Sequence, residues 1–147
     1  MYSRILVAVE HSGADRTILE HVRGLAELCR AELLFVHVAD GWAARNIEAL
    51  KLRESEEIRE DRDYLESLVN EFAGYGLRTR SRLAFGDPAS ELVRVARDER
   101  VDLVAMSTHG HRYLSDLVHG ATADRVRHAL EIPVLMLRVS KEPAQRE

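Results

Sequence analysis

The chain has 147 residues, 46% of them apolar and 31% charged, a size and composition that suit one globular domain spanning residues 1–147. Its net charge of −4 with scattered basic residues argues against a nucleic-acid partner, and no apolar run is long enough for a membrane helix. Cys29 is the only cysteine, which excludes an intrachain disulfide, and without a basic and apolar leader we expect a cytoplasmic protein.

Two buried strands flank a helix in the first forty residues. RILVAV at 4–9 and ELLFVHV at 32–38 are near-continuous apolar runs, which are typical of strands buried on both faces. Between them, from Asp15 to Cys29, apolar residues recur at the spacing of one helical stripe. A strand, helix and strand of this total length predict a right-handed crossover between parallel strands.

The longest connection, from Ala39 to Gly76, predicts one long helix from about Asn46 to Ala73. Its first half is dense in charge (KLRESEEIREDRD), and an apolar stripe develops toward Phe72. A disordered charged tract is the alternative, which the many helix formers and the absence of proline disfavour. Trp42 precedes this helix and is interpreted either as packing beside a ligand or as a lid or interface residue.

The second half of the chain continues the alternation of strands and helices. LRTRSRLAF at 77–85 alternates apolar and polar residues and predicts a strand at a sheet edge. Asp87 and Pro88 suit the N-cap and the first position of a helix. Buried-type strands follow at Leu103–Met106 and Pro133–Leu137. The elements together predict a three-layer α/β domain, a doubly wound parallel sheet of five strands.

Ligands of such sheets bind beyond the carboxyl ends of the strands, where the strand order reverses. The loops expected to meet there are Glu10–Gly13, Val38–Gly41 and Ser107–Gly120, which gather glycines with histidine, acidic and arginine side chains. Neither a G-x-x-x-x-G-K-[ST] phosphate loop nor a G-x-G-x-x-G fingerprint occurs. A response-regulator receiver is also disfavoured, because Glu10 stands alone after the first strand and the last strand ends in Arg138 instead of lysine.

Four blocks of the chain resemble the universal stress protein family, in the family's order. They are ILVAVEHS near the start, LLFVHV, GDPASELVRVARDERVDLVAMSTHG, and HGATADRVRHALEIPVLMLR at the end. The resemblance implies strand order 3-2-1-4-5, a regulatory role in stress responses, and a homodimer formed through the last strand, Val134–Leu137. An uncovered apolar strand at a sheet edge is a liability, so such pairing is physically reasonable.

Members of that family that bind ATP carry G-x2-G-x9-G-[ST] after the fourth strand. The four positions fall here on Ser107, Gly110, Gly120 and Ala121, so the spacing is kept while two residues depart from the pattern. A side chain at 107 either crowds the nucleotide or is accommodated by the backbone, and Ala121 lacks a hydroxyl for phosphate. The amides of residues 120–122 are expected at a helix N-terminus, where they bind an anion, with Thr122 offering a hydroxyl.

The resemblance therefore predicts an adenine-nucleotide site that takes ATP, with Mg²⁺ if the nucleotide is bound. Its residues are expected to be Val9, Glu10, Val38, Met106, Ser107, Gly110, His111, Arg112, Gly120, Ala121 and Thr122. Among them, His111 and Arg112 are assigned to phosphate oxygens, where arginine offers a fixed charge. The alternative is a nucleotide-free interaction protein with an eroded site. Slow ATP hydrolysis is the third hypothesis. It ranks last because the sequence offers no nucleophile–base pair for a dedicated hydrolase.

The remaining histidines have simpler interpretations. His109, His111 and His119 lie near one another in sequence, but no acid stands at ligand spacing, so a metal site is not favoured. His37, within the second strand, is interpreted as a hydrogen-bonded core residue. His21 is expected at the surface of a helix.

Overall fold

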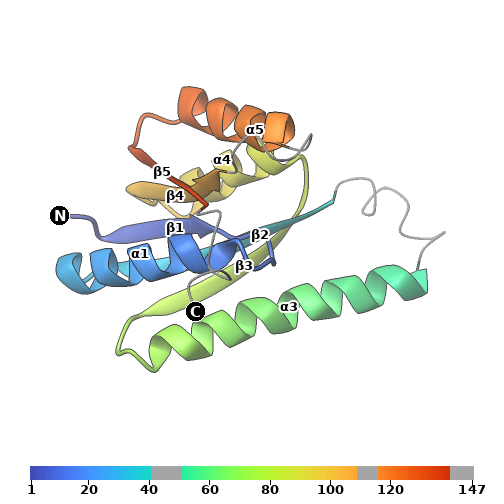
Figure 1. The fold of residues 1–147 in the computed structure, drawn as a ribbon, viewed down its shortest axis with the longest axis horizontal. Helices are drawn as coiled ribbons and strands as arrows, with labels where there is room; N and C mark the ends of the chain where they lie inside the picture. Colours follow the sequence, from blue (N-terminus) through green and yellow to red (C-terminus); the bar gives the residue numbers. More distant parts are fainter. Residues whose placement is uncertain (41–50, 109–115, 140–147) are drawn as a thin grey trace, which may run out of the picture.

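The computed structural model describes residues 1–40, 51–108 and 116–139. In chain order its elements are β1 Arg4–Ala8, α1 Asp15–Cys29, β2 Glu32–Asp40, α3 Lys51–Ala73, β3 Thr79–Gly86, α4 Pro88–Asp98, β4 Leu103–Thr108, α5 Asp116–Ala129 and β5 Val134–Arg138. The strands pair in parallel in the order β3-β2-β1-β4-β5 (Figure 1). The predicted doubly wound sheet is thus confirmed, with the alternating strand β3 at an edge as expected.

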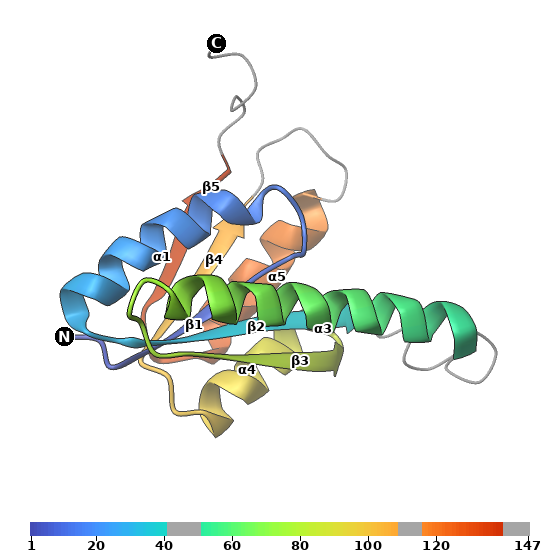
Figure 2. The same ribbon diagram turned by 90° about the horizontal axis from the view of Figure 1, so that it is seen from below.

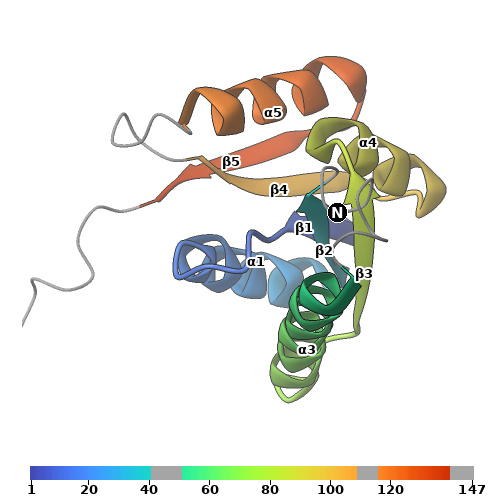
Figure 3. The same cartoon turned by 90° about the vertical axis from the view of Figure 1, so that its right-hand side faces the viewer.

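The sheet is covered on both faces, by α1 and α3 on one side and by α4 and α5 on the other (Figure 3). Phe35 of β2 and Phe72 of α3 are almost fully buried on the first face, with their ring centroids 5.0 Å apart. Val104 and Met106 of β4 pack on the second face, against apolar residues of α4 and α5. Alternate residues of the central strands therefore pack into two separate cores, one on each face of the sheet. This explains why the sequences of these strands are continuous apolar runs.

Helix α3 packs on the sheet through its second half only. Leu65, Leu68 and Phe72 are buried, whereas most residues from 56 to 63 are exposed. Figure 2 shows the amino-terminal part of this helix extending beyond the sheet. The predicted solvated first half is thus confirmed from residue 56 onward. Trp42 and the predicted helical residues 46–50 lie outside the described residues.

Strand β2 is longer than the sequence pattern predicts. It continues to Asp40, because Ala39 and Asp40 still pair with Phe85 and Gly86 of β3. The loop expected to start at Val38 therefore begins at least two residues later. As a result, Val38 has the fixed backbone of a strand instead of a loop.

Helix α4 begins as predicted, with Asp87 as N-cap and Pro88 at its first position. The Asp87 carboxylate accepts a hydrogen bond from the amide of Ser90 at 2.9 Å and two from the Arg125 guanidinium of α5, at 3.1 and 2.9 Å. The bonds from Arg125, followed by those from Ser90, hold the pKa of Asp87 well below its usual range. This exposed cluster joins the two helices that cover the second face of the sheet.

Candidate functional site

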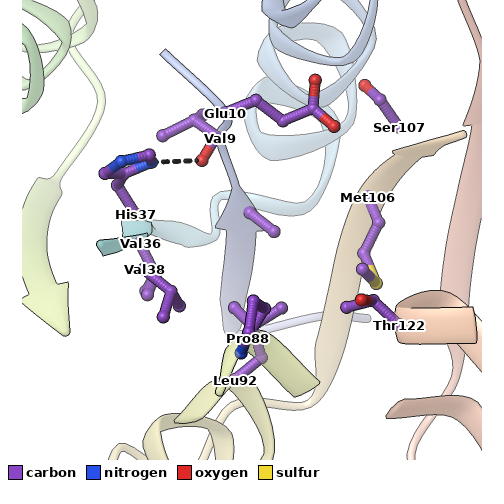
Figure 4. Close-up of a pocket in the computed structure, with 11 residues that line it drawn as sticks. Val9, Glu10, Val36, His37, Val38, Pro88, Leu92, Met106, Ser107 and Thr122 are labelled. Carbon is purple, nitrogen blue, oxygen red and sulfur yellow. Dashed lines mark hydrogen bonds between the residues drawn. The ribbon is translucent and has the colours of Figure 1, made fainter. Parts of the chain in front are cut away.

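A cavity of about 220 Å³ opens at the carboxyl ends of the strands, on the face covered by α4 and α5 (Figure 4). It lies where the strand order reverses between β1 and β4, the place at which doubly wound sheets hold ligands. Its lining residues come from three strands, two helices and the loop after β1: Ala8, Val9, Glu10, Val36, His37, Val38, Pro88, Leu92, Met106, Ser107 and Thr122. The cavity is therefore assembled from segments far apart in the sequence.

The cavity has an apolar chamber and a polar end. Val38, Leu92 and Met106 contribute aliphatic and thioether surface to the chamber, which suits a flat apolar group. Figure 4 shows Glu10 and Ser107 together at the end beyond β1 and β4, with Thr122 beside Met106. A ligand that matches this lining carries a planar ring at one end and hydrogen-bonding groups next to it.

The loop after β1 is held in place by Asp15, whose side chain is 1% exposed. Its carboxylate accepts hydrogen bonds from the backbone amides of Glu10 at 2.8 Å, His11 at 2.9 Å and Ser12 at 3.3 Å. His11 adopts a left-handed backbone, with φ of 63°, which turns its amide toward that carboxylate. Glu10 is thus positioned at the cavity by a buried charge that belongs to the first turn of α1.

Helix α3 holds the same loop from outside. The Tyr64 hydroxyl donates to Asp15 at 2.5 Å, and its ring stacks on His11 with centroids 4.2 Å apart. Burial, followed by this hydrogen bond, raises the pKa of Tyr64 well above its ordinary value, so the hydroxyl stays a donor. Nδ1 of His11 lies 2.8 Å from the Asp61 carboxylate. Side chains of α3 therefore contact the loop after β1, next to the cavity.

His37 is hydrogen-bonded as predicted, yet it is only partly buried and lines the cavity. Its Nδ1–H donates to the carbonyl oxygen of Val9 at 2.9 Å, and its Nε2 lies 3.5 Å from the Asp61 carboxylate. The interpretation as a core residue is therefore wrong in part. Residues near the carboxyl end of a strand leave the core for the binding crevice, a change that an apolar run of residues does not reveal.

Ser107 fits its place without backbone strain. Positive φ among the described non-glycine residues is confined to His11, Arg30 and Arg100, so Ser107 has the ordinary backbone of strand β4. A glycine is not required for conformational freedom at this position. The side chain at 107 is therefore accommodated by an ordinary strand backbone.

Residues 120–122 do not lie at the start of a helix, which is where the sequence predicted them. Helix α5 begins at Asp116, so Ala121 and Thr122 lie in its second turn, beyond the four amides that a helix leaves without helical partners. Ala121 is exposed and does not line the cavity, whereas Thr122 does. The predicted start of this helix is wrong, because the GATAD segment carries no signal that separates the start of a helix from its second turn.

Six of the eleven predicted site residues line the cavity: Val9, Glu10, Val38, Met106, Ser107 and Thr122. Gly110, His111 and Arg112 lie outside the described residues, as do His109 and the predicted contacts to phosphate. Gly120 falls within the bounds of α5. Four further lining residues were not predicted from the sequence: Ala8, Val36, Pro88 and Leu92. Strand pairing and the position of α4 bring them to the cavity without any polar or glycine signal.

Within the described ranges, no group of three histidine, cysteine or acidic side chains is arranged to hold a metal ion. In the same residues, no helix is both long and apolar enough to cross a membrane.

Comparison with known proteins places the chain among similar sequences and folds. Residues 1–138 match the profile of the Universal stress protein family. Universal stress protein MJ0577 of Methanocaldococcus jannaschii is 25% identical, over 94% of this chain and 96% of that protein. A solved structure of MJ0577 superimposes with a TM-score of 0.84, covering 97% of this chain and 99% of that one.

Two further structures share the fold. A universal stress protein in complex with cAMP has a TM-score of 0.67 at 16% identity, covering 95% of this chain and 98% of that one. The universal stress protein from Archaeoglobus fulgidus in complex with dAMP has a TM-score of 0.68 at 20% identity, covering 92% and 97%.

Proposed function

Since this chain belongs to the universal stress protein family, we propose that it binds ATP or a closely related adenine nucleotide in the cavity between β1, β4 and α4 and acts as a stress-response regulator. The observation that carries the proposal is the cavity itself, because six of the residues predicted for a nucleotide site line it at the switch point of the sheet. Relatives in complex with cAMP and dAMP support adenine as the base.

The lining of the cavity supports one orientation of the proposed nucleotide. The base lies in the apolar chamber between Val38, Leu92 and Met106, where its flat surface leaves water. The sugar then reaches the polar end at Glu10 and Ser107. Mg²⁺, when bound with ATP, neutralises part of the phosphate charge. Glu10 and Ser107 orient the sugar, and turnover is not part of this role.

Binding is tested on protein purified without added nucleotide. We expect denatured protein to release adenine nucleotide, measured by chromatography, or emptied protein to bind Mg-ATP in calorimetry. Absence of both released nucleotide and heat in the millimolar range would favour the nucleotide-free interaction protein, for which Ala121, without a hydroxyl, is the supporting observation. Phosphate release at a constant rate with ATP would instead indicate slow hydrolysis.

We also propose that the protein is a homodimer paired through Val134–Leu137. Strand β5 is an edge of the sheet, and Met136 is 39% exposed on it. Unpaired backbone groups and apolar side chains at an edge favour pairing with a second copy. We expect sedimentation to give the mass of a dimer. Met136→Pro removes a backbone donor that faces the open edge, because the backbone groups of the alternate residues Pro133 and Val139 bond to β4, and it should give a monomer. A monomeric wild-type protein at micromolar concentration contradicts this proposal.

A further inference from the structure

Among the residues that the structure describes, the Ser107 hydroxyl is a buried polar group that finds no hydrogen-bond partner. Its residue is 9% exposed, and in the described part of the chain only one other side-chain atom, Nε of Arg4, shares this condition. Nε of Arg4 still lies 3.4 Å from the Glu32 carboxylate, and a second guanidinium nitrogen donates to the Glu99 carbonyl. Of these two residues, Ser107 lines the cavity and Arg4 does not. Because a buried hydroxyl without a partner is costly, this position points to a ligand group that completes its bonding.

The residues around Ser107 indicate what kind of ligand group can bond to its hydroxyl. The parallel register pairs Val7 with Ala105, so Ser107 at the end of β4 lies beside the end of β1, where Glu10 follows. In Figure 4 the Glu10 carboxylate and the Ser107 hydroxyl point toward one another at the polar end of the cavity. A ligand group that sits between them meets a carboxylate, which only accepts hydrogen bonds, and a hydroxyl that has a proton to donate.

We propose that Ser107 is a specificity-determining residue that selects ribonucleotides over deoxyribonucleotides, an inference that rests on the proposed nucleotide site. A ribose hydroxyl donates to the Glu10 carboxylate and accepts from the Ser107 hydroxyl at the same time. Other nucleotide groups do not satisfy both partners: ring nitrogens and ionised phosphates only accept, and the adenine amino group only donates. Phosphate is further disfavoured there by the negative charge of Glu10.

Removal of the ribose hydroxyl leaves the Ser107 hydroxyl buried without a partner in the complex. Sites built to bond a substrate hydroxyl reject the analogue that lacks it strongly, because the polar groups of the site are then unpaired. We therefore expect the wild type to bind ATP at least about tenfold more tightly than the deoxy analogue that lacks the hydroxyl between Glu10 and Ser107.

The test compares ATP, 2′-deoxy-ATP and 3′-deoxy-ATP by calorimetry on the wild type, Ser107→Ala and Ser107→Gly. Both variants should bind ATP about tenfold more weakly than the wild type does. They should bind the deoxy analogue that the wild type disfavours as well as the wild type binds it, so the preference for ATP over this analogue disappears. Ser81→Ala, an exposed serine on β3, should retain it. Thermal unfolding of nucleotide-free Ser107→Ala should not be lowered, because the substitution removes an unpartnered hydroxyl.

Two results overturn the inference in distinguishable ways. Equal binding of all three nucleotides by the wild type, or equal losses for all three in Ser107→Ala, rejects the role of Ser107 and leaves the nucleotide site standing. Absence of binding of any nucleotide by the folded wild type rejects the proposed function together with this inference.

Discussion

Replacement of Asp15 by alanine is expected to lower the free energy of unfolding by about 2–4 kcal/mol, a large part of a typical domain's stability. The carboxylate accepts from three backbone amides of the β1–α1 loop and from the Tyr64 hydroxyl, and it is 1% exposed. Alanine leaves the part-buried Glu10 amide and the Tyr64 hydroxyl without this acceptor. Urea unfolding followed by circular dichroism measures the change.

Two further variants separate the contributions of Asp15. Tyr64→Phe removes a single hydrogen bond and should cost about 1 kcal/mol. Asp15→Asn keeps the size of the side chain but turns one acceptor oxygen into a donor that faces amides, so it should be nearly as unstable as Asp15→Ala. A loss below about 1 kcal/mol in Asp15→Ala would show that water replaces the carboxylate and that this aspartate does not fix the loop.

Replacement of Val38 by tryptophan is expected to reduce nucleotide affinity by about a hundredfold or more, a change of about 3 kcal/mol in binding free energy. Val38 lines the apolar chamber together with Pro88 and Leu92 of α4, and is not fully buried. An indole can therefore enter a cavity of about 220 Å³ and occupy the space of the base. Calorimetry with ATP measures the loss, once the native fold is verified by circular dichroism.

Val38→Ile is the matched control, because it adds one methylene group at the same position and should change affinity by only a few-fold. Together the two variants separate the filling of the cavity from a general disturbance of strand β2. A folded Val38→Trp protein that binds ATP as tightly as the wild type would place the nucleotide elsewhere.

The sequence by itself determined the fold and the first residues of most elements. Apolar runs at 4–9, 32–38 and 103–106 predicted the central strands because a strand covered on both faces has no polar side. Asp87 and Pro88 predicted the start of α4 because capping acts within one turn of helix. The common edge at which parallel strands end predicted Glu10, Val38 and Ser107 at the site, whereas Val9 and Met106 were implied by the resemblance to the family.

Only the tertiary structure decided what surrounds those residues. Leu92 reaches the cavity because α4 packs beside β2, and Tyr64 reaches the β1–α1 loop from 49 residues away along the chain. Such contacts depend on how helices cross the sheet, which local propensity and spacing do not encode. The same holds for Ser107: the sequence marked it as a departure from a glycine motif, whereas packing made it a buried hydroxyl at the edge of a cavity.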